Sequence, residues 1–551
     1  MKFGSQAPLV DPPVRPVQTS PMDDGIAKNH NWIRAIDLEV LQREGRALFR
    51  HQERQIALFA TPDGVFACNN RYPHEGYPLR EGTLGQGCVL TCNWHNWKFD
   101  LKTGANLDRG EGLRTYPVQL RDGEVWLDMT EAPLEVRRAA VMASLKGAFD
   151  DEDYERLARD LARLAELGDP RAALIAAIGW SWQRLEYGWT HAYAGMADWL
   201  ALYEAREGDP EAQLICLLES MAHLSEDCLR QVEHPFVAGE ASWDEDKFLA
   251  AIEAEDEAAS VSRLRGALAS GLHFADLERA ITRAALAHYA DFGHSLIYTV
   301  KAGELIARLG PDVEAPLLHA LVRSFIYATR EDLIPEFRDY AAALKSWGAG
   351  KTAPTAADYD GMNVRRALAL TAERGAAKPM ALYRALLGAN ARNLLMLNLR
   401  LQTKVDQPIV DNAGWLDVTH GITFANAVRR QCTKFPDLWP QGLLQMACFS
   451  GRNSGFVDPS VSLDRWLITK PPGFFAMAID GLFDHGREEN IVAVHLLKTT
   501  LAARAETVEG PADAAAQTLV AGMNRFLNSP LRRRHVRRTM RQAMRFVGQG
   551  E

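Results

Sequence analysis

Tyr72-Pro73-His74-Glu75-Gly76-Tyr77-Pro78-Leu79 and Cys92-Asn93-Trp94-His95-Asn96-Trp97-Lys98-Phe99-Asp100 are the two stretches that decide the fold of the first part of this chain. Seventeen residues, 75–91, separate His74 from Cys92. Two loops that carry thiol and imidazole groups can meet at one metal site, because both groups are good ligands of iron and zinc. The spacing therefore predicts a small metal-binding domain around these loops.

The sequence around the two loops is typical of a small all-β domain. Short β-rich runs at 47–49, 55–59 and 64–67 are separated by turn signals such as Asp63-Gly64 and Asp122-Gly123. We expect this domain to span residues 29–131. Residues 1–28 contain five prolines and little hydrophobic periodicity, so we expect them to form a flexible arm.

The two loops resemble the Rieske [2Fe-2S] domain, in which two Cys hold one iron and two His hold the other. The likeness covers about residues 30–130. The motifs of that family read Cys-x-His, about 17 residues, then Cys-x-x-His. The resemblance implies that His74, Cys92 and His95 are cluster ligands. Tyr72 stands where the family has its first Cys.

The tyrosine leaves several outcomes open for this domain. The phenolate of Tyr72 could serve as an oxygen ligand of a [2Fe-2S] cluster, or Cys68, four residues upstream, could replace the missing thiolate. A different or mononuclear metal could occupy the loops. The fold could also persist without any cluster, because a fold does not by itself determine a cofactor. Cys88 is expected to be a buried strand residue rather than a ligand.

From residue 132 to 551 the sequence is rich in Ala, Leu, Arg and Glu and predicts a large all-α domain. The fold class is therefore multidomain, with a small all-β module followed by a large helical domain. Apolar periodicity with capping residues and stop signals predicts several long helices. They are expected at 172–187, 192–206, 211–230, 276–308, 314–328, 376–399 and 513–527.

Two segments of the helical domain share a pattern around a histidine. Asp291 precedes His294 by three residues, and Asp417 precedes His420 by the same spacing. An Asp at this spacing on a helix could orient an imidazole. The alternative is that each Asp caps a helix and each His packs beneath it.

Two further histidines fit the same kind of site. His191 opens an apolar helix, and Lys498 follows His495 by three residues, on the same helix face. A lysine buried among apolar residues could lose its proton and become reactive.

His294-Ser295-Leu296-Ile297-Tyr298, His420 and the His495-x-x-Lys498 pair resemble motifs of the questin-oxidase-like family. Members of that family are large helical proteins that oxidise aromatic polyketides such as anthraquinones. The resemblance implies a non-haem iron held by His191, His294, His420 and His495, with Lys498 as a carboxylated lysine. The likeness covers scattered segments between about 180 and 505.

Composition limits the classes of function. The net charge of −9 gives no overall attraction to nucleic acid. Seven Cys in 551 residues fit a reducing compartment, and neither a signal peptide nor an apolar run long enough to span a membrane is visible. We therefore expect a cytoplasmic protein with no nucleic-acid or membrane partner.

The C-terminal run Arg532-Arg533-Arg534-His535-Val536-Arg537-Arg538 is strongly basic and could bind nucleic acid or an acidic membrane surface. Val536, Met540 and Met544 recur every four residues, which favours an amphipathic helix docked on the protein by its apolar face.

The leading hypothesis is an iron-dependent oxidoreductase of the oxygenase type. The Rieske-like module would serve a non-haem iron site in the helical domain, which would act on a small organic substrate, with Asp291, Asp417 and Lys498 as catalytic residues. No nucleotide-binding motif is visible, so electrons would come from a separate reductase. The alternative hypothesis is a non-catalytic binding or scaffold protein that carries a degenerate Rieske fold.

Overall fold

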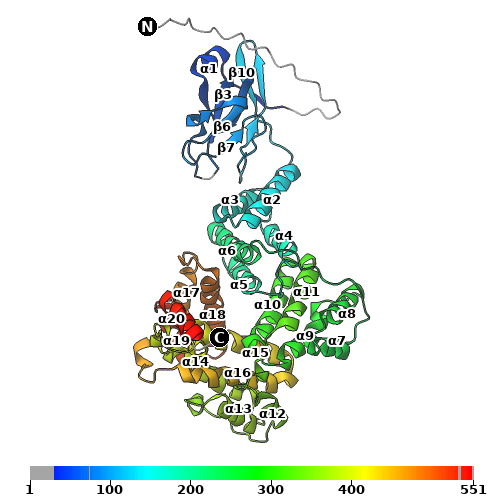
Figure 1. Cartoon of the computed structure of the whole chain (residues 1–551), viewed down its shortest axis with the longest axis vertical. Helices are drawn as coiled ribbons and strands as arrows, with labels where there is room; N and C mark the ends of the chain where they lie inside the picture. Colours follow the sequence, from blue (N-terminus) through cyan, green and yellow to red (C-terminus); the bar gives the residue numbers. More distant parts are fainter. Residues whose placement is uncertain (1–29, 74, 109, 532–534, 549–551) are drawn as a thin grey trace. The chain divides into compact units, whose positions relative to one another are not determined.

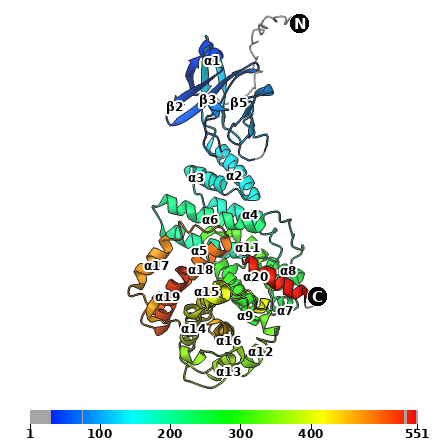
Figure 2. The ribbon, with the colours of Figure 1, turned by 60° about the vertical axis from the view of Figure 1, so that its left-hand side comes forward.

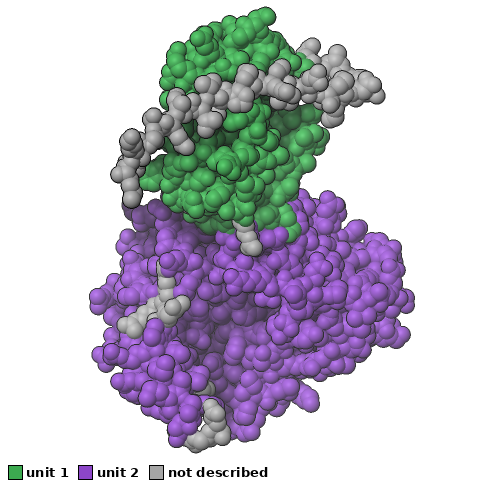
Figure 3. All heavy atoms as spheres, turned by 45° about the horizontal axis from the view of Figure 1, so that its top comes forward, with its two compact units in different colours: residues 1–148, 153–168 green, residues 149–152, 169–551 purple. Residues whose placement is uncertain are grey.

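The computed structural model describes residues 30–73, 75–108, 110–531 and 535–548. The chain divides into two compact units, residues 1–148 with 153–168 and residues 149–152 with 169–551 (Figure 3). The predicted arm at 1–28 and the predicted ligand His74 lie outside the described residues. Among the helices described, none is long and apolar enough to cross a membrane.

The first unit contains three small antiparallel sheets, with strand orders β1-β10-β9, β2-β3-β4-β8 and β5-β6-β7 (Figure 1). Its strands are β1 (Trp32–Asp37), β2 (Arg46–His51), β3 (Arg54–Thr61), β4 (Gly64–Asn69), β5 (Thr83–Leu84), β6 (Val89–Thr91), β7 (Lys98–Asp100), β8 (Thr115–Tyr116), β9 (Val118–Arg121) and β10 (Glu124–Asp128). Its helices are α1 (Leu38–Glu44), most of α2 (Leu134–Asp151) and α3 (Tyr154–Leu167).

The predicted turn signals join strands as expected. Asp122 and Gly123 both have positive φ and connect β9 to β10 in a two-residue hairpin. Thr61 pairs with Gly64 across the hairpin between β3 and β4. The centre of β3, from Ile56 to Phe59, is fully buried between two apolar clusters. These hairpins give the β domain its sheets.

The second unit is helical, which confirms the predicted fold class (Figure 2). Its helices are α4 (Ala172–Ser181), α5 (His191–Ala205), α6 (Pro210–Cys228), α7 (Glu245–Glu253), α8 (Glu257–Ala269), α9 (Phe274–Ala287), α10 (His294–Leu309), α11 (Glu314–Tyr327), α12 (Tyr340–Lys345), α13 (Val364–Glu373), α14 (Pro379–Met396), α15 (Trp415–Lys434), α16 (Trp439–Asn453), α17 (Pro471–Asp480), α18 (Asn490–Glu509), α19 (Ala514–Leu527) and α20 (Val536–Gly548). The limits of the two predicted domains, 29–131 and 132–551, stay a prediction.

The predicted single helix at 276–308 is wrong, because the structure breaks it. Helix α9 ends at Ala287, the 3-10 turn η3 (Asp291–Gly293) follows, and α10 begins at His294. Asp291, Phe292 and Gly293 all have positive φ, which no helix accommodates. The break places His294 at the start of a helix instead of in the middle of one.

The expectation that the apolar face of the C-terminal helix docks on the protein is also wrong. Helix α20 has no buried residue, and the side chains of Val536, Met540 and Met544 are 66%, 60% and 66% exposed. Its described contacts with the rest of the chain are polar and run through Arg541, Gln542 and Arg545 to residues 406–412. Electrostatics and hydrogen bonding, rather than apolar burial, hold this helix.

Candidate metal centre

Four helices of the second unit form a closed ring of neighbours, α5, α10, α15 and α18, in which each contacts the next and α18 returns to α5. Figures 1 and 2 show these helices together near the middle of the unit. Each supplies one histidine. His191 and His294 are the first residues of α5 and α10, whereas His420 and His495 lie in the second turns of α15 and α18.

The four imidazoles meet by their Nε2 atoms. The Nε2 of His294 lies 3.2 Å from that of His191 and 2.9 Å from that of His420. The Nε2 of His495 lies 3.2 Å from that of His420. His191, His420 and His495 each offer a ligand atom within 4.8 Å of the other two. Histidines up to 304 positions apart in sequence thus converge on one point.

The other ring nitrogen of three of these histidines faces a backbone carbonyl. The Nδ1 of His420 lies 2.7 Å from the Leu416 oxygen, and the Nδ1 of His495 lies 2.6 Å from the Ile491 oxygen. His294 makes the equivalent bond to the Asp291 oxygen. A carbonyl only accepts, so each Nδ1 must carry the proton. The Nε2 atoms of these three rings therefore carry lone pairs instead of protons, and they lie close to one another.

Protonation of the four rings is disfavoured. Burial lowers the pKa of His191, His420 and His495 well below the usual value, and the charge of Lys498 lowers it further. The same two causes lower the pKa of His294 to about 3. Neutral imidazole is the form that binds metals. A metal ion between such lone pairs would accept them and relieve their mutual repulsion.

The spacing of these nitrogens fits one metal ion. Two imidazole nitrogens bound at about 2.1 Å with a right angle between them lie about 3.0 Å apart. The three described neighbour distances are 2.9–3.2 Å. Imidazole-rich sites suit iron, copper, nickel and zinc. The residues present therefore fit the metal that the sequence resemblance implies.

The turn before α10 fixes the place of His294. Gly293 has a φ of 82°, and a Cβ at this position would lie 2.4 Å from a ring carbon of Phe424 on α15. Only glycine meets both constraints. Phe292 has a φ of 47°, which is costly for an aromatic residue. This strained turn therefore positions His294 at the start of α10.

The predicted role of Asp291 and Asp417 in orienting the imidazoles is corrected by the structure. The Asp291 carboxylate accepts the backbone N–H of Thr329 at 2.7 Å, and its own backbone carbonyl serves His294. The Asp417 carboxylate accepts the N–H of Gly414 at 2.8 Å and caps α15. Backbone carbonyls, rather than carboxylates, thus orient His294 and His420. The shared Asp spacing reflects the local structure of helix starts.

Lys498 belongs to the same cluster. It lies one turn after His495 on α18, and its Nζ is 3.2 Å from the Nε2 of His420. The side chain is buried, and burial lowers its pKa to about 7. A substantial fraction of this amine is therefore neutral near pH 7, so that it can act as a nucleophile or base.

A cavity of about 210 Å³ adjoins Lys498. Its wall is mostly apolar and includes Ile297, Val300 and Leu501. Its polar side carries Asp198 and Lys301, whose carboxylate and ammonium lie 2.7 Å apart. The second carboxylate oxygen of Asp198 is buried with no hydrogen-bond partner among the described residues. At about 210 Å³ the cavity is smaller than the pockets that hold drug-sized ligands, and its mostly apolar wall with a few polar groups suits a smaller organic molecule.

The two loops of the β domain close on themselves by backbone hydrogen bonds. Tyr72 N–H donates to the Tyr77 carbonyl, and Cys92 N–H donates to the Trp97 carbonyl, both at 2.8 Å. The ring of Tyr72 stacks on that of His95, with centroids 5.6 Å apart and planes at 15°. The loops therefore bring Tyr72, Cys92 and His95 together, as the spacing predicts.

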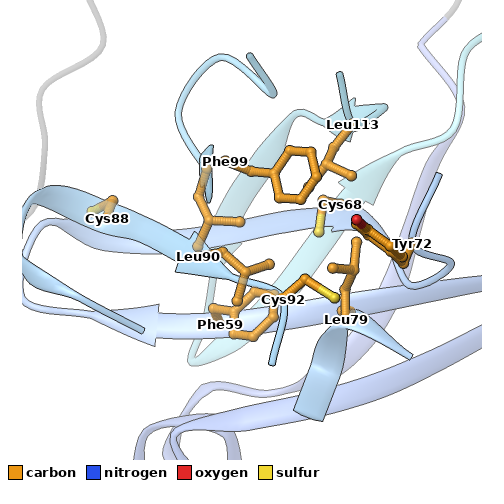
Figure 4. Packing of buried hydrophobic residues seen from close by; sticks show 11 residues of the cluster. Phe59, Cys68, Tyr72, Leu79, Cys88, Leu90, Cys92, Phe99 and Leu113 are labelled. Carbon is orange, nitrogen blue, oxygen red and sulfur yellow. The ribbon is translucent and has the colours of Figure 1, made fainter. Parts of the chain in front are cut away.

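Tyr72 and Cys92 lie in one buried apolar cluster, and Figure 4 shows Cys88 at a distance from both. Burial, then the nearby Cys92, raises the pKa of Tyr72 above its usual value. Cys68 is held in β4 between Ala57 and Thr115, and burial raises its pKa to about 12. The described loops offer one thiol where a Rieske centre needs two thiolates, so they do not match that donor set.

Comparison with known proteins identifies the class of the first unit. Residues 31–128 match the family model of the Rieske-like [2Fe-2S] domain. The ferredoxin subunit of 3-phenylpropionate/cinnamic acid dioxygenase from Escherichia coli (strain K12) is 35% identical over 91 residues, 16% of this chain and 86% of that protein. The chain therefore belongs to the Rieske-like [2Fe-2S] domain family, which confirms this part of the resemblance.

Two other relatives share the same region. The 4beta-methylsterol monooxygenase of Methylococcus capsulatus (strain ATCC 33009 / NCIMB 11132 / Bath) is 32% identical over 115 residues, 19% of this chain and 31% of that protein. The solved ferredoxin of carbazole 1,9a-dioxygenase from Nocardioides aromaticivorans IC177 is 22% identical. That match covers 18% of this chain and 98% of the ferredoxin, with a TM-score of 0.17.

Sequence reasoning selected the four histidines and Lys498 but missed the groups around them. The carbonyls of Leu416 and Ile491 are backbone groups, so no residue type in the sequence marks them. The one available signal is that a histidine inside a helix can reach the carbonyl four residues before it. The Asp198–Lys301 pair also went unnoticed, because its two members lie on different helices, α5 and α10. The packing of α5 against α10 in the structure brings these two side chains together.

Proposed function

We propose that this chain is an iron-dependent oxidoreductase of the oxygenase type, with its iron held by His191, His294, His420 and His495. The observation that carries the proposal is the convergence of Nε2 atoms at 2.9–3.2 Å from their neighbours. The Rieske-like domain would serve this site as an accessory domain, and a separate reductase would supply the electrons. The relatives named for a dioxygenase ferredoxin and a monooxygenase support an iron–sulfur or oxygenase-related role.

Iron bound by the four imidazoles would supply dioxygen activation. The protein's own groups would orient the imidazoles and bind the substrate. The carbonyls of Leu416 and Ile491 hold two rings in the metal-binding tautomer. The cavity beside Lys498 would receive the organic substrate, with its apolar wall excluding water from the reacting carbon atoms.

The resemblance to the questin-oxidase-like family extends the proposal to the substrate and to Lys498. An aromatic, polyketide-like molecule would be the substrate class. The neutral Lys498 amine would add to carbon dioxide and release one proton, which forms a carboxylated lysine with an oxygen ligand. A lowered pKa, about 7, supports this chemistry because only the unprotonated amine reacts. Its position 3.2 Å from His420 Nε2 supports a role beside the iron.

A second candidate function is that of a non-catalytic binding protein with a degenerate Rieske fold. Tyr72, with its raised pKa and its ring stacked on His95, favours this reading of the β domain. It does not explain why four imidazoles of the helical unit meet by their Nε2 atoms, and it is therefore the second candidate.

Iron and acid-labile sulfide in the purified full chain, produced with iron available, distinguish these proposals. A chain that contains iron but no sulfide, and that loses this iron in the His420→Ala variant, supports the helical site. Iron accompanied by stoichiometric sulfide and unchanged in His420→Ala would assign the metal to the β domain alone. A chain with neither iron nor sulfide would support the binding protein.

Nitric oxide probes whether bound ferrous iron has an open position for dioxygen. The proposal expects a half-integer-spin EPR signal from the ferrous nitrosyl adduct of the iron-loaded chain. Loss of this signal in His420→Ala, and its retention in a variant outside the cluster, would assign the adduct to the four-histidine site. Iron that binds no nitric oxide would contradict an oxygenase function.

A further inference from the structure

Helix α20 presents an apolar stripe to solvent. Val536, Met540, Met544 and Val547 follow one another at helical spacing and are 60–66% exposed. At 1.5 Å per residue the stripe is about 16 Å long. The neighbouring Phe546 is 62% exposed. An apolar stripe that a helix exposes to solvent usually marks a site that binds another protein or a membrane.

Polar contacts hold the opposite face of α20 against the protein. The Arg541 guanidinium lies 3.1 Å from the Asp406 carboxylate, and Arg545 donates to the Asp406 carbonyl at 2.8 Å. Gln542 donates to Asn412 and to the Gln407 carbonyl at 2.9 Å and 3.0 Å. These contacts orient the helix, so the stripe faces outward because the polar face is attached.

The charge of α20 differs from that of the whole chain. Residues 536–548 contain four arginines and no acidic residue, whereas the net charge of the chain is −9. Arg537 is exposed and follows Val536 at the edge of the stripe. Cations beside an apolar stripe complement a surface that combines negative charge with an apolar interior.

We propose that α20 is an interfacial helix that attaches the protein to an anionic lipid surface. The Val and Met side chains would enter the boundary between headgroups and acyl chains, while exposed arginines would contact lipid phosphates. A second copy of the same helix is a poorer partner, because residues 536–548 contain no acidic side chain that could pair with the Arg537 of the other copy.

Co-sedimentation of the full chain with lipid vesicles tests the proposal. We expect binding to vesicles that contain phosphatidylglycerol and weak binding to vesicles of phosphatidylcholine alone. Removal of the exposed Arg537 beside the stripe, in Arg537→Gln, should weaken binding about fivefold. Raised salt should also weaken it.

Substitutions on the stripe test whether the stripe itself is the surface that binds lipid. Met540→Asp with Met544→Asp should abolish sedimentation with phosphatidylglycerol vesicles. Met477→Asp is the matched control, because Met477 lies on α17 and is 70% exposed, and it should leave binding unchanged. All these positions are solvent-exposed, and equal thermal unfolding midpoints would verify that each variant folds.

Three results would overturn the proposal. One is a chain that stays in the supernatant with both vesicle types. Another is equal binding to both types, which would remove the role of charge. The third is a chain that forms dimers in solution through α20, with Met540→Asp and Met544→Asp restoring the monomer, since the stripe would then be an interface between copies.

Discussion

Replacing His420 with alanine removes an imidazole that contacts two other histidines of the cluster and Lys498. Its Nε2 lies 2.9 Å from that of His294, 3.2 Å from that of His495 and 3.2 Å from the Nζ of Lys498. The variant leaves three imidazoles that face the same point. The chain should therefore still bind a divalent ion, but more weakly.

The expected loss follows from the number of ligands. Protein sites built from four strong ligands bind zinc with apparent free energies of about 10–16 kcal/mol, so that each ligand contributes about 3 kcal/mol. At about 1.4 kcal/mol per tenfold change, His420→Ala should weaken metal binding by about 100-fold. Anaerobic titration of the metal-free chain with Fe(II), or with Co(II) as a coloured substitute, measures this change.

His319 supplies a matched control for this experiment. It is a buried histidine on α11, and its Nδ1 lies 2.6 Å from the carbonyl of Ala315, four residues earlier, as in His420. It packs against Trp182 and Phe236 instead of other imidazoles. His319→Ala should lose folding stability but keep metal affinity. Equal metal affinities of His420→Ala and the unmodified chain would refute the shared site.

Three further changes test other parts of the account. Tyr72→Cys completes the Rieske ligand set and should raise the acid-labile sulfide bound after reconstitution, and equal sulfide in both proteins would refute this. Burial raises the pKa of Glu331 to about 8 from its ordinary value of 4.5. The folded chain then holds a proton that the unfolded chain releases, so stability should fall between pH 4.5 and 8 by about 4 kcal/mol. Glu331→Gln should flatten that slope in urea unfolding at several pH values, and an unchanged slope would contradict the raised pKa. Gly293→Ala should clash with Phe424, displace His294 and weaken metal binding more than it lowers the unfolding midpoint, and unaltered affinity would show that the turn does not place the ring.

The β domain could be predicted from the sequence because its signals are local. Asp122-Gly123 encodes a hairpin by its own backbone preferences, and the spacing of His74, Cys92 and His95 marks the two loops. The structure brings Tyr72, Cys92 and His95 together, while His74 lies outside the described residues. Whether the loops hold a cluster could not be predicted, because the donor set departs from the family at the position of Tyr72.

The histidine site could be predicted only in part. The motifs selected four histidines, but their convergence depends on the packing of α5, α10, α15 and α18, whose contacts are long-range. The break at η3 was missed because Ala-rich periodicity runs on both sides of it, and positive φ at Phe292 leaves no trace in composition. The amphipathic pattern of α20 identified its apolar face but not what covers that face.

The two aspartates show why spacing alone could not assign roles. An Asp three residues before a His at the start of a helix can orient the ring, or it can accept backbone N–H groups. Asp291 and Asp417 both do the second. The two roles have the same sequence signature, and only the position of the carboxylate oxygens distinguishes them.

Anomalous diffraction at the iron absorption edge, from crystals of the full chain loaded with Fe(II), tests the central claim most directly. The account predicts an iron peak bounded by the Nε2 atoms of His191, His294, His420 and His495, at about 2.0–2.2 Å from each. Iron density elsewhere, with these four rings turned away from any common point, would contradict it.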